Sequence, residues 1–281
     1  MPRRSLSTFA LLVVLVASGC SLLAKKTPTP AARIDEQALA QTPPPPNERY
    51  FLMMFGSQNA LHQPKYSHTW ATLVRAIYIP GNPEPMLEVN TISWLPTKID
   101  INPLSRHVEP GANLELHATI KNALDTRQKI AMWGPYEVSH GFAYRFRVQK
   151  DFLDSGEVGY QCNDVVGEAA RTGDGCDCIH AVSDMDPAFP RWRYPLSFFG
   201  TSATSNLVRR FMHSPITIDG DKTHDWLLCR LGLNDYPIEH RTYRGKIVPY
   251  VPGSAGLQDG IVGAPKEPTP KTAPGVDDKR P

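Results

Sequence analysis

Three segments near the start of the chain have the apolar and β-branched content of strands. Residues 50–55 form an unbroken apolar run, residues 66–78 are rich in β-formers, and residues 87–94 alternate between apolar and polar positions. The turn Pro80-Gly81-Asn82-Pro83 separates the last two, so the pattern predicts an antiparallel pair. Because strand follows strand before most of the helices, we expect an α+β domain with an antiparallel sheet packed against helices.

The later part of the chain has mainly helical periodicity, with apolar residues three or four positions apart. The predicted segments are a helix after Asn113, a strand over 127–133 that Gly134-Pro135 closes, a helix over 135–153, a polar loop over 165–175 and a helix over 205–212. No stretch of the chain repeats another, which argues against a solenoid.

One stretch, residues 175–184 (GCDCIHAVSD), combines a helix start with a thiol. Asp177 is a good N-cap residue, and the apolar residues after it predict that Cys178 lies in the first turn of a buried helix. Unpaired N–H groups at a helix start stabilise a thiolate, which is the nucleophilic form of cysteine. The carboxylate of Asp177 opposes this effect, so we expect an imidazolium nearby to balance it.

Composition limits the classes of function. The chain has 281 residues, of which 41% are hydrophobic and 21% are charged, and this is enough for one good-sized core. Its formal net charge is +2, and the basic residues are scattered. We therefore expect no nucleic-acid partner.

The first twenty residues have the features of an export signal. Arg3 and Arg4 precede an uncharged apolar run over 9–17, which is too short to span a bilayer stably. Ser18-Gly19-Cys20 then resembles the lipobox of bacterial lipoproteins. That resemblance implies that Cys20 is lipidated, becomes the mature N-terminus and attaches the protein to a membrane of the cell envelope, facing the periplasm.

Proline-rich segments flank the expected domain. Residues 21–49 contain four consecutive prolines and few large apolar side chains, which is typical of a stiff tether. Residues 251–281 have the same character and cannot bury enough surface to fold. We therefore expect a signal peptide over 1–20, a tether over 21–49, one folded domain over 50–250 and a disordered tail over 251–281.

The thiol stretch also carries a family resemblance. Cys178-Ile179-His180-Ala181-Val182 resembles the Asn-Cys-Glu-His-Phe-Val signature of the lecithin:retinol acyltransferase group, which belongs to the circularly permuted NlpC-type papain-like cysteine enzymes. In that superfamily a strand-opening histidine precedes a cysteine at a helix N-terminus, and His68 and Cys178 follow this order. The likeness covers about residues 50–184, and Asp177 and Ile179 depart from the signature. It implies a papain-like fold.

The resemblance further implies an acyl-transfer mechanism without a cofactor. His68 would take the thiol proton or pair with the thiolate, and Cys178 would attack an amide or ester carbonyl. Asn90 and Ser93, on the next antiparallel strand, are candidates for the group that orients the imidazole. His180 would either line the substrate site or satisfy an internal hydrogen bond, which is the commoner use of such a histidine.

The other cysteines leave alternatives open. Cys176 and Cys178 are too close in sequence to prefer each other, so in an oxidising compartment each could pair with Cys162 or Cys229. Alternatively, Cys178 stays a free nucleophile while Cys162 and Cys176 form a bridge. A structural zinc held by these cysteines with His180 is a third arrangement, but Cys-x-Cys-x-His is not a standard finger spacing, and no metal is expected.

Two functions from different classes follow from these observations. The first is an exported lipoprotein whose domain is a cysteine-dependent acyl hydrolase or acyltransferase, acting on cell-wall peptides or lipid esters. A location in the cell envelope favours cell-wall peptides as substrates, whereas the resemblance of the cysteine motif to acyltransferases favours lipid esters. The second is a non-catalytic envelope protein, stabilised by disulfides, that binds a partner.

The anchor is tested by mass spectrometry of the mature protein. We expect the N-terminal peptide to begin at Cys20 and to carry the mass of a lipid. An unmodified N-terminus beyond Cys20 would reject the anchor and leave an ordinary cleaved signal.

Overall fold

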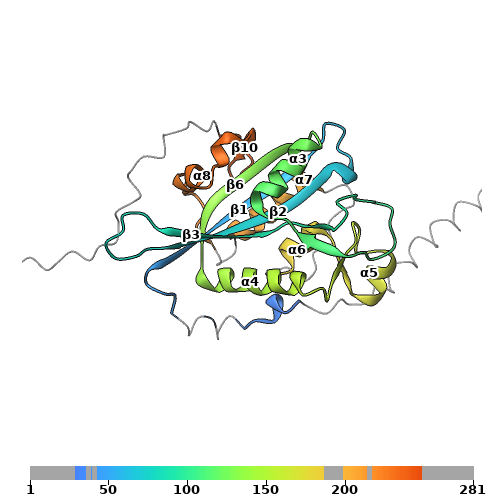
Figure 1. The fold of residues 1–281 in the computed structure, drawn as a ribbon, viewed down its shortest axis with the longest axis horizontal. Coiled ribbons are helices and arrows are strands. Elements are labelled where there is room, and N and C mark those ends of the chain that lie inside the picture. Colours follow the sequence, from blue (N-terminus) through green and yellow to red (C-terminus); the bar gives the residue numbers. More distant parts are fainter. Residues whose placement is uncertain (1–28, 36–38, 40–42, 187–198, 214–216, 249–281) are drawn as a thin grey trace, which may run out of the picture.

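A computed structural model describes residues 29–35, 39, 43–186, 199–213 and 217–248 of the chain (Figure 1). Its centre is a six-stranded mixed sheet in the order β10-β6-β1-β2-β3, with β9 paired to β6. The strands of this sheet are β1 (Glu48–Gln58), β2 (Ser67–Ile77), β3 (Met86–Ile92), β6 (Lys129–Val138), β9 (Thr217–Asp219) and β10 (Ile238–Arg241). The predicted α+β class is confirmed at this level.

Helices and short strands surround the sheet. The helices are α3 (Leu116–Asp125), α4 (His140–Asp154), α5 (Gly167–Thr172), α6 (Cys178–Ser183), α7 (Gly200–His213) and α8 (Trp226–Arg230), with 3₁₀ turns η2 (Ala31–Arg33), η3 (Pro64–Tyr66) and η4 (Leu233–Asp235). Two small ribbons join β4 (Trp94–Pro96) to β5 (Gly111–Asn113) and β7 (Gly159–Tyr160) to β8 (Gly175–Cys176). No described helix is both long and apolar enough to cross a membrane.

The three predicted N-terminal strands form the middle and one edge of the sheet. β2 pairs antiparallel with β1 and β3, as the turn between the strands predicts. The expectation of an antiparallel sheet is corrected at the other edge, where β10 pairs parallel with β6. The sequence signal was weak there because β10 has only four residues, all half-buried.

The alternation of β-strand side chains divides the core into two clusters, one on each face of the sheet. On the α4 face, Leu52 and Leu73 pack with residues of α4, α6 and α7. On the α3 face, Phe55 and Trp70 pack with residues of α3 and α8. Figure 1 shows α4 below the sheet and α8 on its other side. Along β2, side chains therefore alternate between the two faces, and each packs against the helices of its own face.

Three predicted boundaries are corrected. Residues 135–138 belong to β6, which continues past Gly134-Pro135 with a register shift opposite Leu52 and Met54, so α4 begins only at His140. The predicted loop over 165–175 contains α5, a single short helix. Part of the expected tether packs on the domain, because Ala31 is fully buried and Arg145 of α4 donates to the carbonyl of Ile34 at 3.0 Å.

The edge of β2 opens where β3 leaves the sheet. The β2–β3 ladder runs from Ile77–Met86 to Ala71–Ile92, so residues 67–70 of β2 have no β3 partner. Beyond Ile92 the chain turns into β4, which pairs with β5 instead. Helix α6 packs against β2. This open edge places the N-terminal part of β2 within reach of α6.

Close approach of α7 to β1 yields the first stability prediction. A Cβ on Gly56 would lie 2.5 Å from Thr204 Oγ1 and 2.8 Å from Thr201 Cα. Thr204 Oγ1 donates to the carbonyl of Phe55 or Gly200, at 3.1 and 2.9 Å, so it is not free to move away. We expect Gly56→Ala to lower the free energy of unfolding by about 1–3 kcal/mol, measured by urea denaturation.

The matched control is Gly141→Ala in α4, where the nearest atom to an added Cβ is Leu39 Cδ1 at 3.5 Å. Alanine favours a helix over glycine, so this variant should be unchanged or more stable by up to about 1 kcal/mol. Equal stability of Gly56→Ala and the wild-type protein would contradict the tight packing of α7.

Candidate functional site

Helix α6 begins as the sequence predicts. Asp177 is its N-cap, and Oδ1 accepts the backbone N–H groups of Ile179 at 2.9 Å and His180 at 2.8 Å. Ile179, Ala181 and Val182 are buried in the cluster on the α4 face. The cap and the buried face together fix the direction in which α6 leaves the β7–β8 ribbon.

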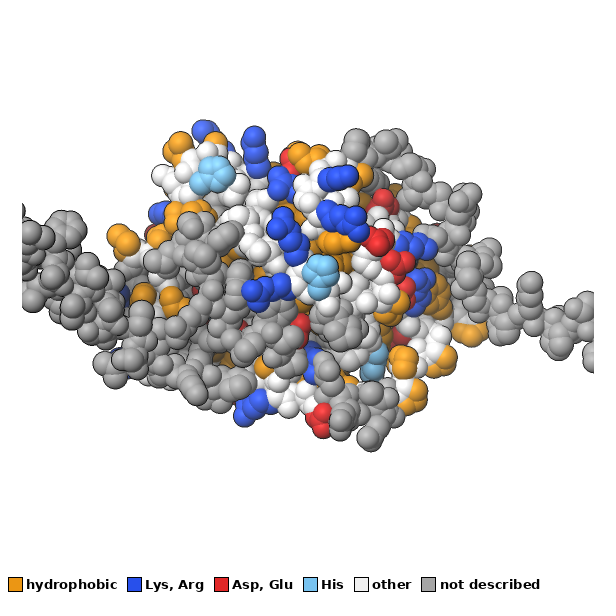
Figure 2. Space-filling view, turned by 180° about the vertical axis from the view of Figure 1, so that it is seen from behind, with side chains coloured by type: hydrophobic (Ala, Val, Ile, Leu, Met, Phe, Trp, Pro, Cys, Tyr) orange, Lys and Arg blue, Asp and Glu red, His pale blue; other side chains and the backbone are white. Residues whose placement is uncertain are grey.

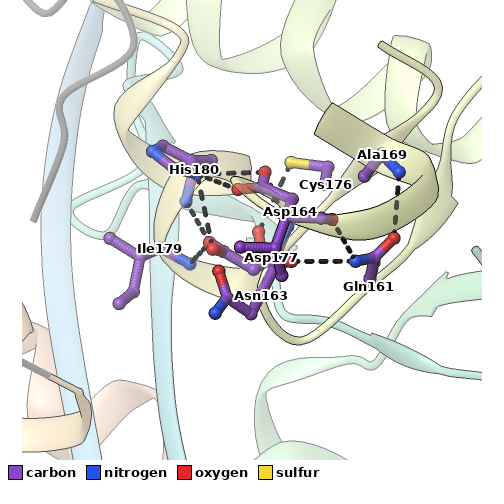
Figure 3. A network of polar contacts seen from close by, with 9 residues as sticks. Gln161, Asn163, Asp164, Ala169, Cys176, Asp177, Ile179 and His180 are labelled. Carbon is purple, nitrogen blue, oxygen red and sulfur yellow. Dashed lines mark hydrogen bonds and ion pairs between the residues drawn. The ribbon is translucent and has the colours of Figure 1, made fainter. Parts of the chain in front are cut away.

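Three buried polar side chains converge next to this cap (Figure 3). Nδ1 of His180 lies 2.8 and 3.0 Å from the two carboxylate oxygens of Asp164, and 3.3 Å from Oδ2 of Asp177. The backbone N–H of Asp177 also donates to Asp164 Oδ2 at 3.3 Å. All three residues are at most 2% exposed. The network therefore ties the loop that carries Asp164 to the first turn of α6.

Electrostatics makes His180 the cation of this network. Burial alone would lower its pKa, but the carboxylates of Asp164 and Asp177 outweigh burial and raise the pKa of His180 well above its ordinary value. The ring is thus an imidazolium at neutral pH. It is not the imidazolium expected to stabilise a thiolate, because the groups that lower the pKa of the Cys178 thiol are the backbone N–H groups of Thr69 and Cys178. The alternative in which His180 lines the substrate site is corrected, because the ring is fully buried and Nδ1 is taken.

Gln161 organises the loop on the other side of the network. Its Nε2 donates to the carbonyls of Asn163 at 2.8 Å and Val166 at 2.7 Å, and its Oε1 accepts the N–H of Ala169 at 3.0 Å. Neither Gln161 nor Asp164 was singled out in the sequence. The extended segment before a polar loop gave no motif, and only the fold brings that segment beside α6.

Cys178 lies at the open edge of β2 as a partly buried residue packed against the cluster on the α4 face. Burial first, and the Asp177 carboxylate second, raise the pKa of its thiol well above the ordinary value, and the backbone N–H groups of Thr69 and Cys178 lower it by less. The expected resting thiolate is therefore corrected to a neutral thiol at neutral pH. The burial that makes α6 stable outweighs the favourable helix start.

His68 lies on the same strand next to Thr69, but its side chain points to the α3 face. Its ring stacks on Trp70 with centroids 5.3 Å apart, and Nε2 lies 3.0 Å from the hydroxyl of Ser93. The predicted contact with Ser93 is thus present, and its catalytic role stays a prediction. Burial lowers the pKa of His68 to about 3, so the ring is neutral. Within the part of the chain that the structure describes, Nδ1 has no hydrogen-bond partner.

The second candidate for orienting His68 is corrected. Asn90 pairs with Leu73, which belongs to the cluster on the α4 face. Cross-strand partners share a face, so Asn90 and His68 lie on opposite faces of the sheet. Ser93 is an odd number of residues from Asn90, so its side chain points to the opposite face, the one that His68 faces. It directly follows the last residue of β3, and its hydroxyl lies beside the His68 ring.

The four described cysteines are all reduced in the structure, as one of the alternatives has it for Cys178. Cys162, Cys176, Cys178 and Cys229 all have free thiols. Cys229 is exposed on α8, whose leucines pack on the α3 face, so it is separated by the sheet from the other three. A pair of disulfides that includes Cys229 is therefore incompatible with this fold, because bridged cysteines need Cα atoms within about 7 Å.

The zinc alternative fails for a related reason. Among the described residues, the group whose ligand atoms lie within 4.8 Å of one another is Asp164, Asp177 and His180, and it contains no cysteine. Its oxygen atoms already accept from Nδ1 of His180 and from backbone N–H groups. The proton on Nδ1 of His180, shared with the two carboxylates, therefore explains why these three side chains lie together, without a metal ion.

Exposed basic side chains gather on one side of the molecule. Figure 2 shows Lys and Arg side chains gathered on the side of the molecule opposite to the view of Figure 1. Arg209, Arg210, Arg244 and Lys246 are exposed basic residues of α7 and of the segment after β10. Arg244 lies 3.7 Å from Asp221 and also donates to Tyr243 Oη. Positive and negative side chains are mixed on this surface, so it does not suggest a binding site for an anionic ligand. We therefore place the candidate site at the edge of β2.

The buried network predicts a pH-dependent loss of stability in Asp164→Asn. We expect the free energy of unfolding to fall by about 3 kcal/mol at about pH 6, because the imidazolium of His180 loses its main partner. His180 has a raised pKa in the folded protein, so its contribution is complete below the unfolded value of about 6.5 and fades as pH rises. The loss measured by urea denaturation should therefore shrink towards about pH 9.

The control for this comparison is Asp174→Asn, because Asp174 is exposed in the same region. Its unfolding free energy should change by less than about 0.5 kcal/mol at every pH. A loss in Asp164→Asn that grows with pH would contradict a charged His180.

Comparison with known proteins leaves the site to be argued from its own chemistry. No family model, no curated protein and no solved structure matches this chain. The family resemblance of the thiol stretch thus has no support beyond its own residues, and the assignment depends on the geometry around His68 and Cys178.

Proposed function

We propose that the protein is an exported, lipid-anchored envelope protein whose domain is a cysteine-dependent acyl hydrolase or acyltransferase. One observation carries this proposal. Nε2 of His68 lies 3.0 Å from the hydroxyl of Ser93, Nδ1 has no hydrogen-bond partner among the described residues, and the backbone N–H of Thr69, the next residue, lowers the pKa of the Cys178 thiol. A histidine held through one ring nitrogen with the other available is the arrangement that a general base needs.

The proposed reaction forms and breaks a thioester. Nδ1 of His68 takes the proton of the Cys178 thiol while the sulfur attacks the carbonyl carbon of an amide or ester. The protonated ring then gives that proton to the leaving amine or alcohol, which leaves an acyl group on the sulfur. Water or an acceptor releases the acyl group by the reverse sequence. The N–H groups of Thr69 and Cys178 are the donors we assign to the oxyanion.

The protonation states favour a general-base mechanism over a resting ion pair. His68 is neutral because burial lowers its pKa to about 3, and Cys178 is a thiol because burial raises its pKa. A neutral pair costs less to remove from water than an ion pair, and charge develops only when the sulfur attacks. Serine at position 93 can accept the Nε2–H of the ring as it becomes positive.

The fold supports a papain-like assignment in its chain order. A histidine on an early strand precedes a cysteine at the start of a later helix, and that helix packs on the histidine's own strand. We infer a circularly permuted NlpC-type domain from this order. Cell-wall peptides and lipid esters are the substrate classes, and Cys20, outside the described residues, is the proposed lipid attachment site.

A second candidate is a non-catalytic envelope domain that binds a partner. The observation that favours it is the Cys178 thiol, whose raised pKa leaves little thiolate at neutral pH. In that case the hydrogen bond between His68 and Ser93 would have only a structural role, because it gives each buried polar group a partner.

Labelling with a thiol-directed acyl probe separates the two functions. We expect an activated ester to acylate Cys178 in the reduced full-length protein, mapped by peptide mass spectrometry. His68→Ala should slow this step by about 100-fold or more, because the general base is lost, and Ser93→Ala should slow it by about 10-fold. The rate should stay nearly constant between about pH 6 and 9, because the imidazole of His68 and the thiol of Cys178 are both neutral throughout that range. A rate that rises about tenfold per pH unit would instead indicate attack by a thiolate without help from His68.

Two internal controls are available. Exposed Cys229 reports ordinary thiol reactivity and should be insensitive to His68→Ala. His62→Ala removes an exposed histidine from the loop before β2 and should leave the labelling of Cys178 unchanged. Labelling of Cys229 without Cys178, or labelling of Cys178 that ignores His68→Ala, would remove the enzyme and favour the binding domain.

A further inference from the structure

The β7–β8 ribbon places two thiols opposite each other. These strands are parallel, with Gly159 opposite Gly175 and Tyr160 opposite Cys176. The N–H of Gln161 donates to the carbonyl of Cys176 at 3.1 Å, which is the last rung of this ladder. The ladder ends there, but Asp177 still has an extended backbone (φ −91°, ψ 175°), so the Cα atom of Cys178, the first residue of α6, remains on the path of β8. An extension of the register by two residues therefore places Cys162 beside Cys178.

Strand geometry separates this pair from the alternative with Cys176. Paired residues on neighbouring strands are about 5 Å apart, whereas an offset of two residues adds about 6.6 Å along the strand and brings the separation to about 8 Å. Disulfides need Cα atoms within about 7 Å. Cys178 therefore fits as the partner of Cys162, and Cys176 does not. The Cys176 thiol is also buried and donates to the Asp177 carbonyl at 3.3 Å.

The polar network holds the two segments together beyond the ribbon. Asp164, two residues after Cys162, accepts the N–H of Asp177, which directly precedes Cys178. The thiols also influence each other, since Cys162 raises the pKa of Cys178 and both raise that of Tyr160. Both cysteines are only partly buried, so a small reagent can reach this edge.

We propose that Cys162 and Cys178 form a reversible disulfide. Each thiol gives up one proton, the two sulfurs together give up two electrons, and one S–S bond forms. The oxidant is a small-molecule disulfide such as oxidised glutathione, which is reduced to two thiols. Exchange passes through a mixed disulfide on one cysteine, which the other cysteine then displaces.

The bond would act as a switch on the proposed enzyme. Cys178 cannot attack a carbonyl while its sulfur is bonded to Cys162, and reduction restores the nucleophile. This regulatory meaning rests on the proposed function, whereas the bond itself does not. Burial raises the pKa of Cys162 to about 12, so exchange is slow at neutral pH and faster in mildly alkaline solution.

Peptide mapping tests the bond directly. The reduced full-length protein is treated with excess oxidised glutathione at mildly alkaline pH, denatured in an alkylating agent and digested with trypsin. Trypsin places Cys162 in residues 151–171 and both other candidates in residues 172–191. Further cleavage before Asp177 separates Cys176 from Cys178. We expect one bridge, between Cys162 and Cys178, with Cys176 and Cys229 alkylated.

Serine variants provide the matched comparison. Cys176→Ser should keep the bridge, while Cys162→Ser and Cys178→Ser should each abolish it. A bridge from Cys162 to Cys176, a glutathione adduct on Cys178 that Cys162 never displaces, or alkylation of both Cys162 and Cys178 would overturn the proposal. Because the wild-type protein is mapped first, the result does not depend on the folding of any variant.

The acyl probe distinguishes failure of the switch from failure of the enzyme. Labelling of Cys178 should disappear in oxidised wild-type protein and return on reduction. In Cys162→Ser no bridge can form, so any loss of labelling under oxidation should map to a glutathione adduct on Cys178. Labelling that survives oxidation would overturn the switch while leaving the enzyme intact. No labelling of reduced protein, together with a mapped bridge, would reject the enzyme and keep the disulfide.

Discussion

The buried contact of His180 with Asp164 and Asp177 fixes the start of helix α6, and with it the position of the candidate site. Ionised groups away from water contribute little net stability, yet losing one partner is costly, so such a network specifies an arrangement more than it stabilises it. Here it fastens the loop after β7 to the start of α6. The positions of Cys162 and Cys178 follow from that attachment.

A second constraint is the departure of β3 from β2 after Ile92. A strand edge without a partner leaves backbone N–H groups that must be satisfied, and helix α6 covers this part of β2. The same departure turns Ser93 toward His68. The break thus leaves the edge of β2 open beside Cys178, which packs on the α4 face, while the His68 ring lies on the α3 face. Proton transfer between them around this open edge belongs to the proposed reaction.

Charge is distributed unevenly across this region. His180 is positive because two carboxylates surround it, whereas His68 is neutral because burial is the only influence on its pKa. The cation therefore stabilises the structure of α6 and the neutral imidazole is left for proton transfer in the proposed reaction. Two buried histidines of one domain differ in protonation because only one has acidic neighbours.

The sequence by itself determined the local elements and several of their functional residues. Apolar runs and turn residues located β1, β2 and β3, and Asp177 was identified as the N-cap of α6, because these signals act over a few neighbouring residues. It also identified Ser93 as a neighbour of His68, since adjacent antiparallel strands bring such positions together. Only the tertiary structure decided the parallel β10, the packing of the predicted tether and the partnership of Asp164 with His180. Those features join segments distant in sequence, and burial at the resulting contacts, which no local pattern encodes, set the protonation of His68 and Cys178.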